Sequence, residues 1–352
     1  MTPASSARIH VGVDENGLGP RLGPLIVTAV TARVDDGAAR LLGKRPRGGA
    51  GDRLGDSKRL ASFGDTSPLG EAWASAIVKR TDPAARFDSP AALLARVTLD
   101  DEPTLRALCP SHHESMCWGG DGESLVGDGS LEEAVRRDLD RLASRGVEVL
   151  SVRSSIVCAR RLNDAVGRGL SRFHSDLHAM ESLVIDAARR HGPGVAATCG
   201  KVGGFDRYGG VFAHLGLHVP LVEGRARSEY RVPGIGDVAF VRDAEDGHLL
   251  VAMASLVGKW ARDLLMRRIV RFHRDRATNV PEASGYYDPV TTQFIAATAL
   301  ARKTARVDDA CFLRRKLETD AGEAPSATST PSPSRPARTR ATPSASRSPR
   351  PS

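Results

Sequence analysis

Apolar and polar positions recur along the chain in patterns that predict strands and helices in succession. Short apolar runs rich in β-branched residues predict strands at 9–13, 25–30, 147–152 and 195–199. Apolar residues at helical spacing predict helices at 131–145, 175–190 and 248–272. Strands that alternate with helices favour an α/β or α+β domain.

Gly, Pro and polar clusters divide these elements. A Gly/Pro-punctuated segment at 16–24 joins the first two strands, which predicts a hairpin. Residues 35–58 are rich in Gly, Arg and Asp and are expected to form a loop. The stretch 319–352 holds mainly Ser, Pro, Thr, Ala and Arg without periodicity, so it buries too little apolar surface to offset its ordering entropy. We therefore expect a domain at 8–318, with insertions near 40–75 and 102–130, followed by a disordered basic tail.

Composition narrows the class of protein. The 352 residues are 41% hydrophobic and 26% charged, which is typical of a soluble globular protein. The net charge of +8 favours a polyanionic partner such as nucleic acid or an anionic membrane. No apolar run approaches the roughly 18 residues that span a bilayer, and five cysteines, an odd number, do not indicate a secreted disulfide scaffold. We expect a cytoplasmic monomer with reduced thiols and no membrane partner.

Two acids, Asp14 and Glu15, end the first predicted strand. Adjacent side chains on a strand point to opposite sides, so both face one site only if the strand end twists or bends. Gly17 and Gly19 would let a substrate backbone approach, and their N–H groups would bind phosphate or hydroxyl oxygens. A plain acidic surface turn is the alternative interpretation.

Two later segments have similarly open interpretations. Ser57 and Lys58, within 55–60, suit phosphate contacts, or they begin a solvated helix with Ser57 or Asp56 as the N-cap. Lys259 and Asp263 are four residues apart on one predicted helix face, where they would form an ion pair.

Taken in order, the three segments resemble ribonuclease HII. That family opens with Asp-Glu-Ala-Gly-Arg-Gly-Pro after a short strand and continues with Asp-Ser-Lys-Lys-Leu. Later it has a helix of the form Ala-Ala-Ser-Ile-Leu-Ala-Lys-Val-Thr-Arg-Asp and then a Gly-Tyr turn. This chain matches at 14–20 and 56–60, at Ala254, Ser255, Lys259, Arg262 and Asp263, and at Gly285 with Tyr286. The resemblance covers roughly residues 9–300.

The resemblance implies a ribonuclease H-like fold with a central mixed sheet flanked by helices. It also implies an endoribonuclease that cuts RNA in RNA–DNA hybrids or at ribonucleotides embedded in DNA. In the family, four carboxylates hold two divalent ions, usually Mg²⁺ or Mn²⁺, that activate water and stabilise the leaving oxygen. The match assigns Asp14, Glu15 and Asp263 as three catalytic metal ligands.

The fourth carboxylate is missing from the expected strand end, where this chain has Cys199 or Gly200. Three interpretations follow: Asp206 substitutes from the following Gly-rich loop, the site works poorly with three carboxylates, or the protein binds without cleaving. Because a lost acid leaves the metals under-neutralised, reduced activity is favoured.

The remaining substrate contacts are implied by the same match. In the family, the Gly-Arg-Gly backbone senses the ribose 2′-hydroxyl group. Leu18 replaces the Arg between Gly17 and Gly19, so the phosphate contact of that Arg is lost. The two glycines leave the backbone contacts open to form, and ribonucleotide selectivity becomes an open question. Tyr286 matches a tyrosine that stacks on a sugar, or it is a half-buried aromatic residue in a turn. Ser57, Lys58 and Lys259 complete the expected substrate-binding set.

A Cys/His-rich stretch at 109–117 lies outside the resemblance. Cys109, His112 or His113, and Cys117 would supply three of the four ligands of a Zn²⁺ site, with Cys158 from elsewhere. Alternatively, Cys109 and Cys117 are small buried apolar residues. The sequence thus predicts a metal-dependent endoribonuclease that is impaired unless another group replaces the lost carboxylate. The rivals are a catalytically degenerate ribonuclease H-like nucleic-acid-binding protein and a zinc-stabilised interaction protein.

Overall fold

A computed structural model describes residues 7–44, 49–54, 68–110, 115–126, 129–202 and 205–316. These described residues belong to one compact unit. The proposed tail at 319–352 lies outside the described residues. Within these residues, no helix combines the length and apolar character needed to cross a membrane.

The centre of the unit is a seven-stranded mixed sheet with the order β3-β2-β1-β4-β7-β6-β5. Its strands are β1 (Ala7–Asn16), β2 (Leu25–Asp35), β3 (Val147–Val157), β4 (Val195–Gly200), β5 (Val219–Glu223), β6 (Arg227–Val232) and β7 (Gly236–Val241). The first three strands form an antiparallel meander, which confirms the predicted hairpin between the first two. Strand β4 then returns parallel to β1, and β7 lies parallel to β4.

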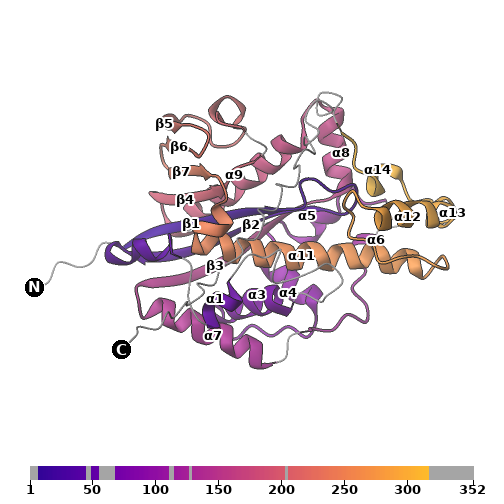
Figure 1. Cartoon of the computed structure of the whole chain (residues 1–352), viewed down its shortest axis with the longest axis horizontal. Helices are drawn as coiled ribbons and strands as arrows, with labels where there is room; N and C mark the ends of the chain where they lie inside the picture. The colour runs from indigo at the N-terminus through magenta and orange to yellow at the C-terminus, as the bar shows by residue number, and fades with distance from the viewer. Residues whose placement is uncertain are drawn as a thin grey trace, which may run out of the picture. The chain divides into compact units, whose positions relative to one another are not determined.

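Helices cover both faces of the sheet, as Figure 1 shows. One face carries α11 (Leu249–Arg274), with α3 (Pro68–Thr81), α4 (Pro90–Val97) and α7 (Gly129–Ala143). The other face carries α9 (Arg172–His191), with α8 (Ala159–Gly167) packed on it. The predicted fold class, a mixed sheet flanked by helices, is therefore confirmed.

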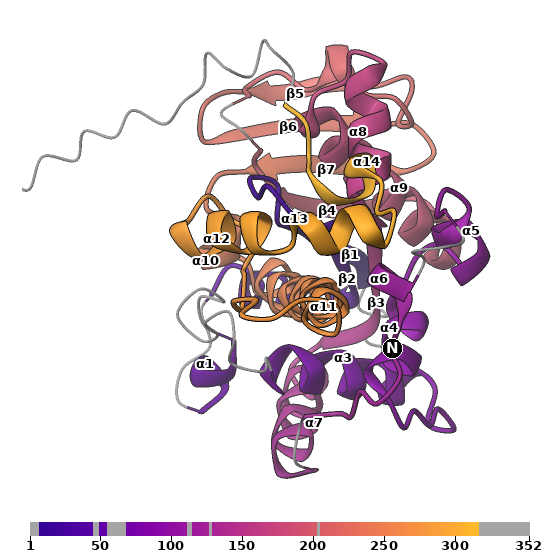
Figure 2. The same cartoon turned by 90° about the vertical axis from the view of Figure 1, so that its right-hand side faces the viewer.

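Short elements complete the described chain. They are η1 (Asp36–Leu41), α1 (Gly49–Arg53), α5 (Glu102–Arg106), α6 (Ser115–Trp118), η2 (Gly209–Val211), α10 (Ala244–Gly247), α12 (Pro289–Ala297), α13 (Ala299–Thr304) and α14 (Asp309–Phe312). The expectation of a loop throughout 35–58 is wrong at η1 and α1, whose short helical turns gave no apolar periodicity. Figure 2, turned by 90°, shows α11 end-on, with α12 and α13 above it and α3 and α7 below it.

Close packing of α11 on β1 depends on Gly12. A Cβ atom at this position would come within 2.4 Å of the Leu250 carbonyl carbon, so any side chain would push the helix away. The neighbours Val11 and Val13 face the opposite way, into the core beneath α9. This alternation leaves Asp14 on the α11 side of the sheet.

The far half of α11 buries a histidine. His273 is fully buried, and its ring lies edge-on to Phe272, Phe294 and Phe312 at centroid distances of 5.1, 5.7 and 5.3 Å. Both ring nitrogens lack a hydrogen-bond partner among the described residues. Burial, reinforced by nearby Arg302 and Arg276, lowers the pKa of His273 to about 4 from its ordinary 6.5.

We predict that acid destabilises the protein partly through His273. Its folded pKa lies below its unfolded one, so the folded state is favoured fully above about pH 6.5 and loses stability as the pH falls toward 4. The loss is roughly 3 kcal/mol. In His273→Phe, urea unfolding at several pH values should show a shallower slope in this window. The slope should not vanish, because half-buried His248 also has its pKa lowered to about 4. An unchanged slope would contradict the assignment.

Candidate nucleic-acid interface

Three parallel strand ends meet at one edge of the sheet. In the ladder, Val13 pairs with Cys199, and Gly200 pairs with Val241. The residues that follow these pairs enclose a cleft of about 670 Å³. Crevices outside the carboxyl ends of parallel strands are common ligand sites in open α/β sheets.

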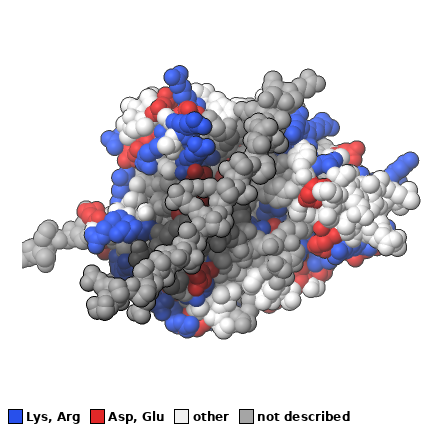
Figure 3. Space-filling model, viewed as in Figure 1, with Lys and Arg blue, Asp and Glu red and all other residues white. Residues whose placement is uncertain are grey.

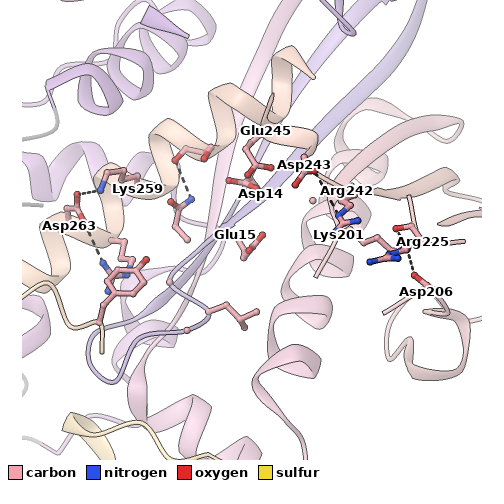
Figure 4. Close-up of a pocket in the computed structure, with 18 residues that line it drawn as sticks. Asp14, Glu15, Lys201, Asp206, Arg225, Arg242, Asp243, Glu245, Lys259 and Asp263 are labelled. Atoms are coloured by element: carbon pink, nitrogen blue, oxygen red, sulfur yellow. Dashed lines mark hydrogen bonds and ion pairs between the residues drawn. The ribbon is translucent and has the colours of Figure 1, made fainter. Parts of the chain in front are cut away.

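Asp14 lies at the base of this cleft and is 5% exposed. Burial raises its pKa well above the ordinary value, and the charges of Glu15 and Glu245 add to the rise. A hydrogen bond with the Ser255 side chain acts in the opposite direction. Figure 4 shows Glu245 beside Asp14, at the start of the segment that leads into α11. Asp14, Glu15 and Glu245 thus all line the cleft at this strand end.

Gly200 occupies the position that faces these acids. A Cβ atom there would lie 3.2 Å from Asp14 Oδ1 and 3.4 Å from Glu15 Oε2. Cys199 instead packs in the core beneath α9. Of the two residues considered for the missing carboxylate, Gly200 is thus the one that points into the cleft, and it has no side chain to offer.

Asp206 lies across the cleft from Asp14 and faces a lysine. Lys201 Nζ approaches Asp206 Oδ1 at 2.8 Å and also donates to the carbonyl oxygen of Arg225 at 3.2 Å. In Figure 4 the Asp206 side chain points toward Lys201, at the end of the cleft remote from Asp263. This geometry gives no support to its proposed role as a substitute ligand.

Asp263 is held by cations. Lys259 Nζ lies 3.0 Å from Asp263 Oδ2, and Arg262 Nη1 lies 3.6 Å from Oδ1. The side chain of Asp263 is 2% exposed. Lys259 and Asp263 share a helical face and form an ion pair, as predicted. The pair holds the Asp263 carboxylate against cations of its own helix, α11.

These donors do not fit the four-carboxylate, two-ion site that the resemblance implied. Within the described part of the chain, no three His, Cys, Asp or Glu side chains stand together as metal ligands. The central position is glycine, and Asp263 is committed to Lys259. Since hard divalent cations need several oxygen ligands, the cleft as built lacks the charge to hold two of them.

The glycine-rich loop after β1 is shaped from inside by two buried arginines. Arg314 Nη1 donates to the carbonyl oxygen of Gly17 at 2.6 Å, and its Nε donates to that of Gly23 at 2.7 Å. Arg172 Nη1 reaches the carbonyl oxygens of Gly19 and Pro20 at 3.3 and 3.1 Å. Gly17 has a φ of 92°, a conformation that disfavours side chains. The expected substrate loop of Gly17, Leu18 and Gly19 therefore lines the cleft with its carbonyls turned inward.

Tyr286 is 46% exposed at the rim of the cleft. The guanidinium of Arg262 lies 4.6 Å from its ring centroid, and Arg262 Nη2 donates to the Ser284 carbonyl oxygen at 2.9 Å. The ring is thus backed by a cation and keeps an open surface. Ser57, Lys58 and His112 lie outside the described residues.

Sequence reasoning missed several residues of the cleft. They are Arg225, Arg242, Asp243 and Glu245, from the β5–β7 hairpins and α10. Their segments match no family motif, and only the adjacent acids in 243–246 offered a signal. Asp176 on α9 was also missed: it is fully buried, its oxygens have no partner among the described residues, and burial, with the charge of Asp14, raises its pKa well above the ordinary value.

The sequence matches no family model, and it is similar to no curated protein. Solved structures of similar fold are ribonucleases H. Bst ribonuclease HIII in complex with Mn²⁺ is 14% identical, with a TM-score of 0.40 over 87% of this chain and 66% of that one. Ribonuclease H2 from Pyrococcus horikoshii is 13% identical, with a TM-score of 0.41 over 89% and 96%. Ribonuclease HII from Archaeoglobus fulgidus, in a complex with PCNA, is 14% identical, with a TM-score of 0.36 over 89% and 99%.

At these identities the likeness concerns the fold alone. The chain spans just under two thirds of the two Bst ribonuclease HIII chains that it matches, 62% and 66% of their lengths.

We predict that Arg314→Leu destabilises the protein by roughly 2–4 kcal/mol, because it leaves loop carbonyls buried without donors. Hydrogen exchange should accelerate at 17–23 more than in β2. The matched control is Arg315→Leu, since the Arg315 side chain is exposed. Equal exchange at 17–23 in the two variants would show that Arg314 does not hold the loop.

Proposed function

We propose that the chain is a ribonuclease H-like protein that binds RNA–DNA hybrid, or DNA with embedded ribonucleotides, in the cleft at the ends of β1 and β4. We further propose that it has lost efficient metal-dependent cleavage. The observation that carries this proposal is the position of Gly200. A side chain there would lie beside Asp14 and Glu15, where a carboxylate is needed, but glycine has none. The ordered match to ribonuclease HII motifs supports the substrate class.

Binding is supported by the cations that surround the acids. Arg225 and Arg242 are exposed and line the cleft beside Lys201. Figure 3 shows Lys and Arg side chains gathered over the part of the molecule where Figure 1 places β5 to β7. Guanidinium groups suit bidentate contacts with phosphate, so this rim would follow a nucleic-acid backbone.

The opposite end of the cleft would contact the sugar. Tyr286 presents an open ring face, and Gly19 has no atom within 4 Å of the position where a Cβ would lie. A ribose could therefore approach the loop backbone closely, which is how a protein tells RNA from DNA. Leu18 adds an apolar contact in place of a charged one.

A weaker nuclease is the second candidate, and Glu245 is the observation that favours it. Glu245 lies close enough to Asp14 to raise its pKa. Asp14, Glu15 and Glu245 would then be the acids of an incomplete site. In this case cleavage should be slow rather than absent.

We predict that Arg225→Ala and Arg242→Ala each weaken binding of a fluorescent RNA–DNA hybrid at low salt. Each substitution should make the negative slope of log affinity against log salt concentration shallower by about one, because one phosphate contact disappears. Arg137→Ala is the control, since exposed Arg137 lies on α7, away from the cleft. Binding that responds equally to all three substitutions would rule out this rim as the interface.

We also predict that Gly200→Asp increases Mg²⁺-dependent cleavage by an order of magnitude or more, because it supplies the missing carboxylate. The new Cβ requires shifts of only a few tenths of an ångström at Asp14. Gly210→Asp makes the same charge change in open space and should have no effect. If Gly200→Asp folds and binds hybrid normally but gains no cleavage, the proposed cause of the weak activity is wrong.

A further inference from the structure

Four of the five cysteines meet around one small cavity that shares no lining residue with the cleft. They come from the end of the segment after α5, from α6, from the start of α8 and from α14: Cys109, Cys117, Cys158 and Cys311. The first and the last are more than two hundred positions apart. Convergence of these distant residues depends on α14 packing against α8.

The cavity has the size of a single small guest. Its volume is about 20 Å³, and a space of roughly 10–15 Å³ already holds one water molecule. A buried water needs two to four polar partners. Apart from the sulfurs, however, the wall is formed by Leu108, Met116, the Trp118 ring and Arg160, whose guanidinium group pairs with Asp164 and Asp308. The space therefore suits a soft cation better than water.

Two of the sulfur atoms have polar surroundings, although burial raises the pKa of the Cys117, Cys158 and Cys311 thiols. Trp118 Nε1 donates to Cys109 Sγ at 3.2 Å. Cys158 is the N-cap residue of the nine-residue helix α8, where the helix dipole favours negative charge. All four cysteines are half-buried, so an ion can reach them.

We propose that Cys109, Cys117, Cys158 and Cys311 bind one zinc ion as a four-thiolate structural site. Four sulfurs in tetrahedral array are a standard zinc environment, and zinc binds as the thiols release their protons. In the described residues no three of these thiols stand together as metal ligands, so the proposal requires the four side chains, which line one cavity, to rotate inward when the ion binds. The site ties the 102–118 insertion and the end of the domain to α8.

This ligand set differs from the one expected from sequence. Cys109, Cys117 and Cys158 belong to both sets, and Cys311 takes the place expected of His112 or His113. Cys311 could not be found by spacing, because no second cysteine or histidine lies near it in the sequence.

The test uses the full chain, purified under reducing conditions and freed of metal by a chelator. Co²⁺ is titrated first, because tetrahedral cobalt–thiolate sites give charge-transfer and d–d absorption bands. Zn²⁺ is then added as competitor. We expect one Co²⁺ per chain, displacement by one Zn²⁺, and a raised thermal midpoint with zinc.

Variants assign the ligands. Cys158→Ala and Cys311→Ala should each weaken zinc binding at least tenfold and diminish the charge-transfer band. Cys199→Ala should bind as the unmodified chain does, because Cys199 lies in the separate core under α9. Circular dichroism of each metal-free variant separates lost binding from lost folding.

Two outcomes would overturn the proposal. One is the absence of cobalt–thiolate bands in the folded, reduced chain. The other is unchanged affinity in a folded Cys311→Ala variant, which would mean that the ion uses other ligands. Because hybrid binding is not a readout, failure here leaves the proposed function untouched.

Discussion

The parallel pairing of β1 with β4 is the constraint on which the site depends. Because Val13 lies opposite Cys199, the next residues along the two strands, Asp14 and Gly200, also lie side by side at the strand ends. Gly12 allows α11 to rest directly on β1, which brings the Ser255 end of this helix against the acids. A shift of one residue in this register would bury Asp14 in the α9 core.

The same alternation decides which residue is missing from the cleft. Cys199 packs in the apolar core beneath α9, so it does not contribute to the charge of the cleft. Gly200 is the residue whose identity matters, because a side chain there would enter between two carboxyl groups. Burial of the Asp14 carboxyl group disfavours its charged form, and this raises its pKa. The cleft retains its acids, its cationic rim and its glycine loop, but not the charge density that two metal ions require.

Much of the fold could be predicted from sequence. The strands that became β1 to β4 and the helices α7, α9 and α11 have clear periodicity, since each buries one face or one full run of apolar residues. The β5–β7 hairpins escaped detection because β5 is exposed along its whole length and its neighbours are short. The insertions likewise form short helices that packing, rather than local propensity, determines.

The site was only partly predictable for a related reason. Asp14, Glu15 and the Gly17–Gly19 loop are contiguous, so a motif reveals them. Glu245, Arg225 and Arg242 join the cleft through strand order alone, and Arg314 joins it through the end of the domain. Convergence of the four cysteines has the same origin. Residues that meet only because of the strand order have no characteristic spacing in the sequence, so no motif reveals them.

The most direct test of this account is single-turnover cleavage of a duplex with one embedded ribonucleotide by the unmodified chain, with Mg²⁺ or Mn²⁺, at saturating protein. Binding is measured on the same samples, and Asp14→Asn serves as the background. The account predicts that the duplex is bound and is cut hardly faster than by Asp14→Asn. Rapid cleavage that Asp14→Asn abolishes would contradict it, because it would show that Gly200 leaves the metal site intact.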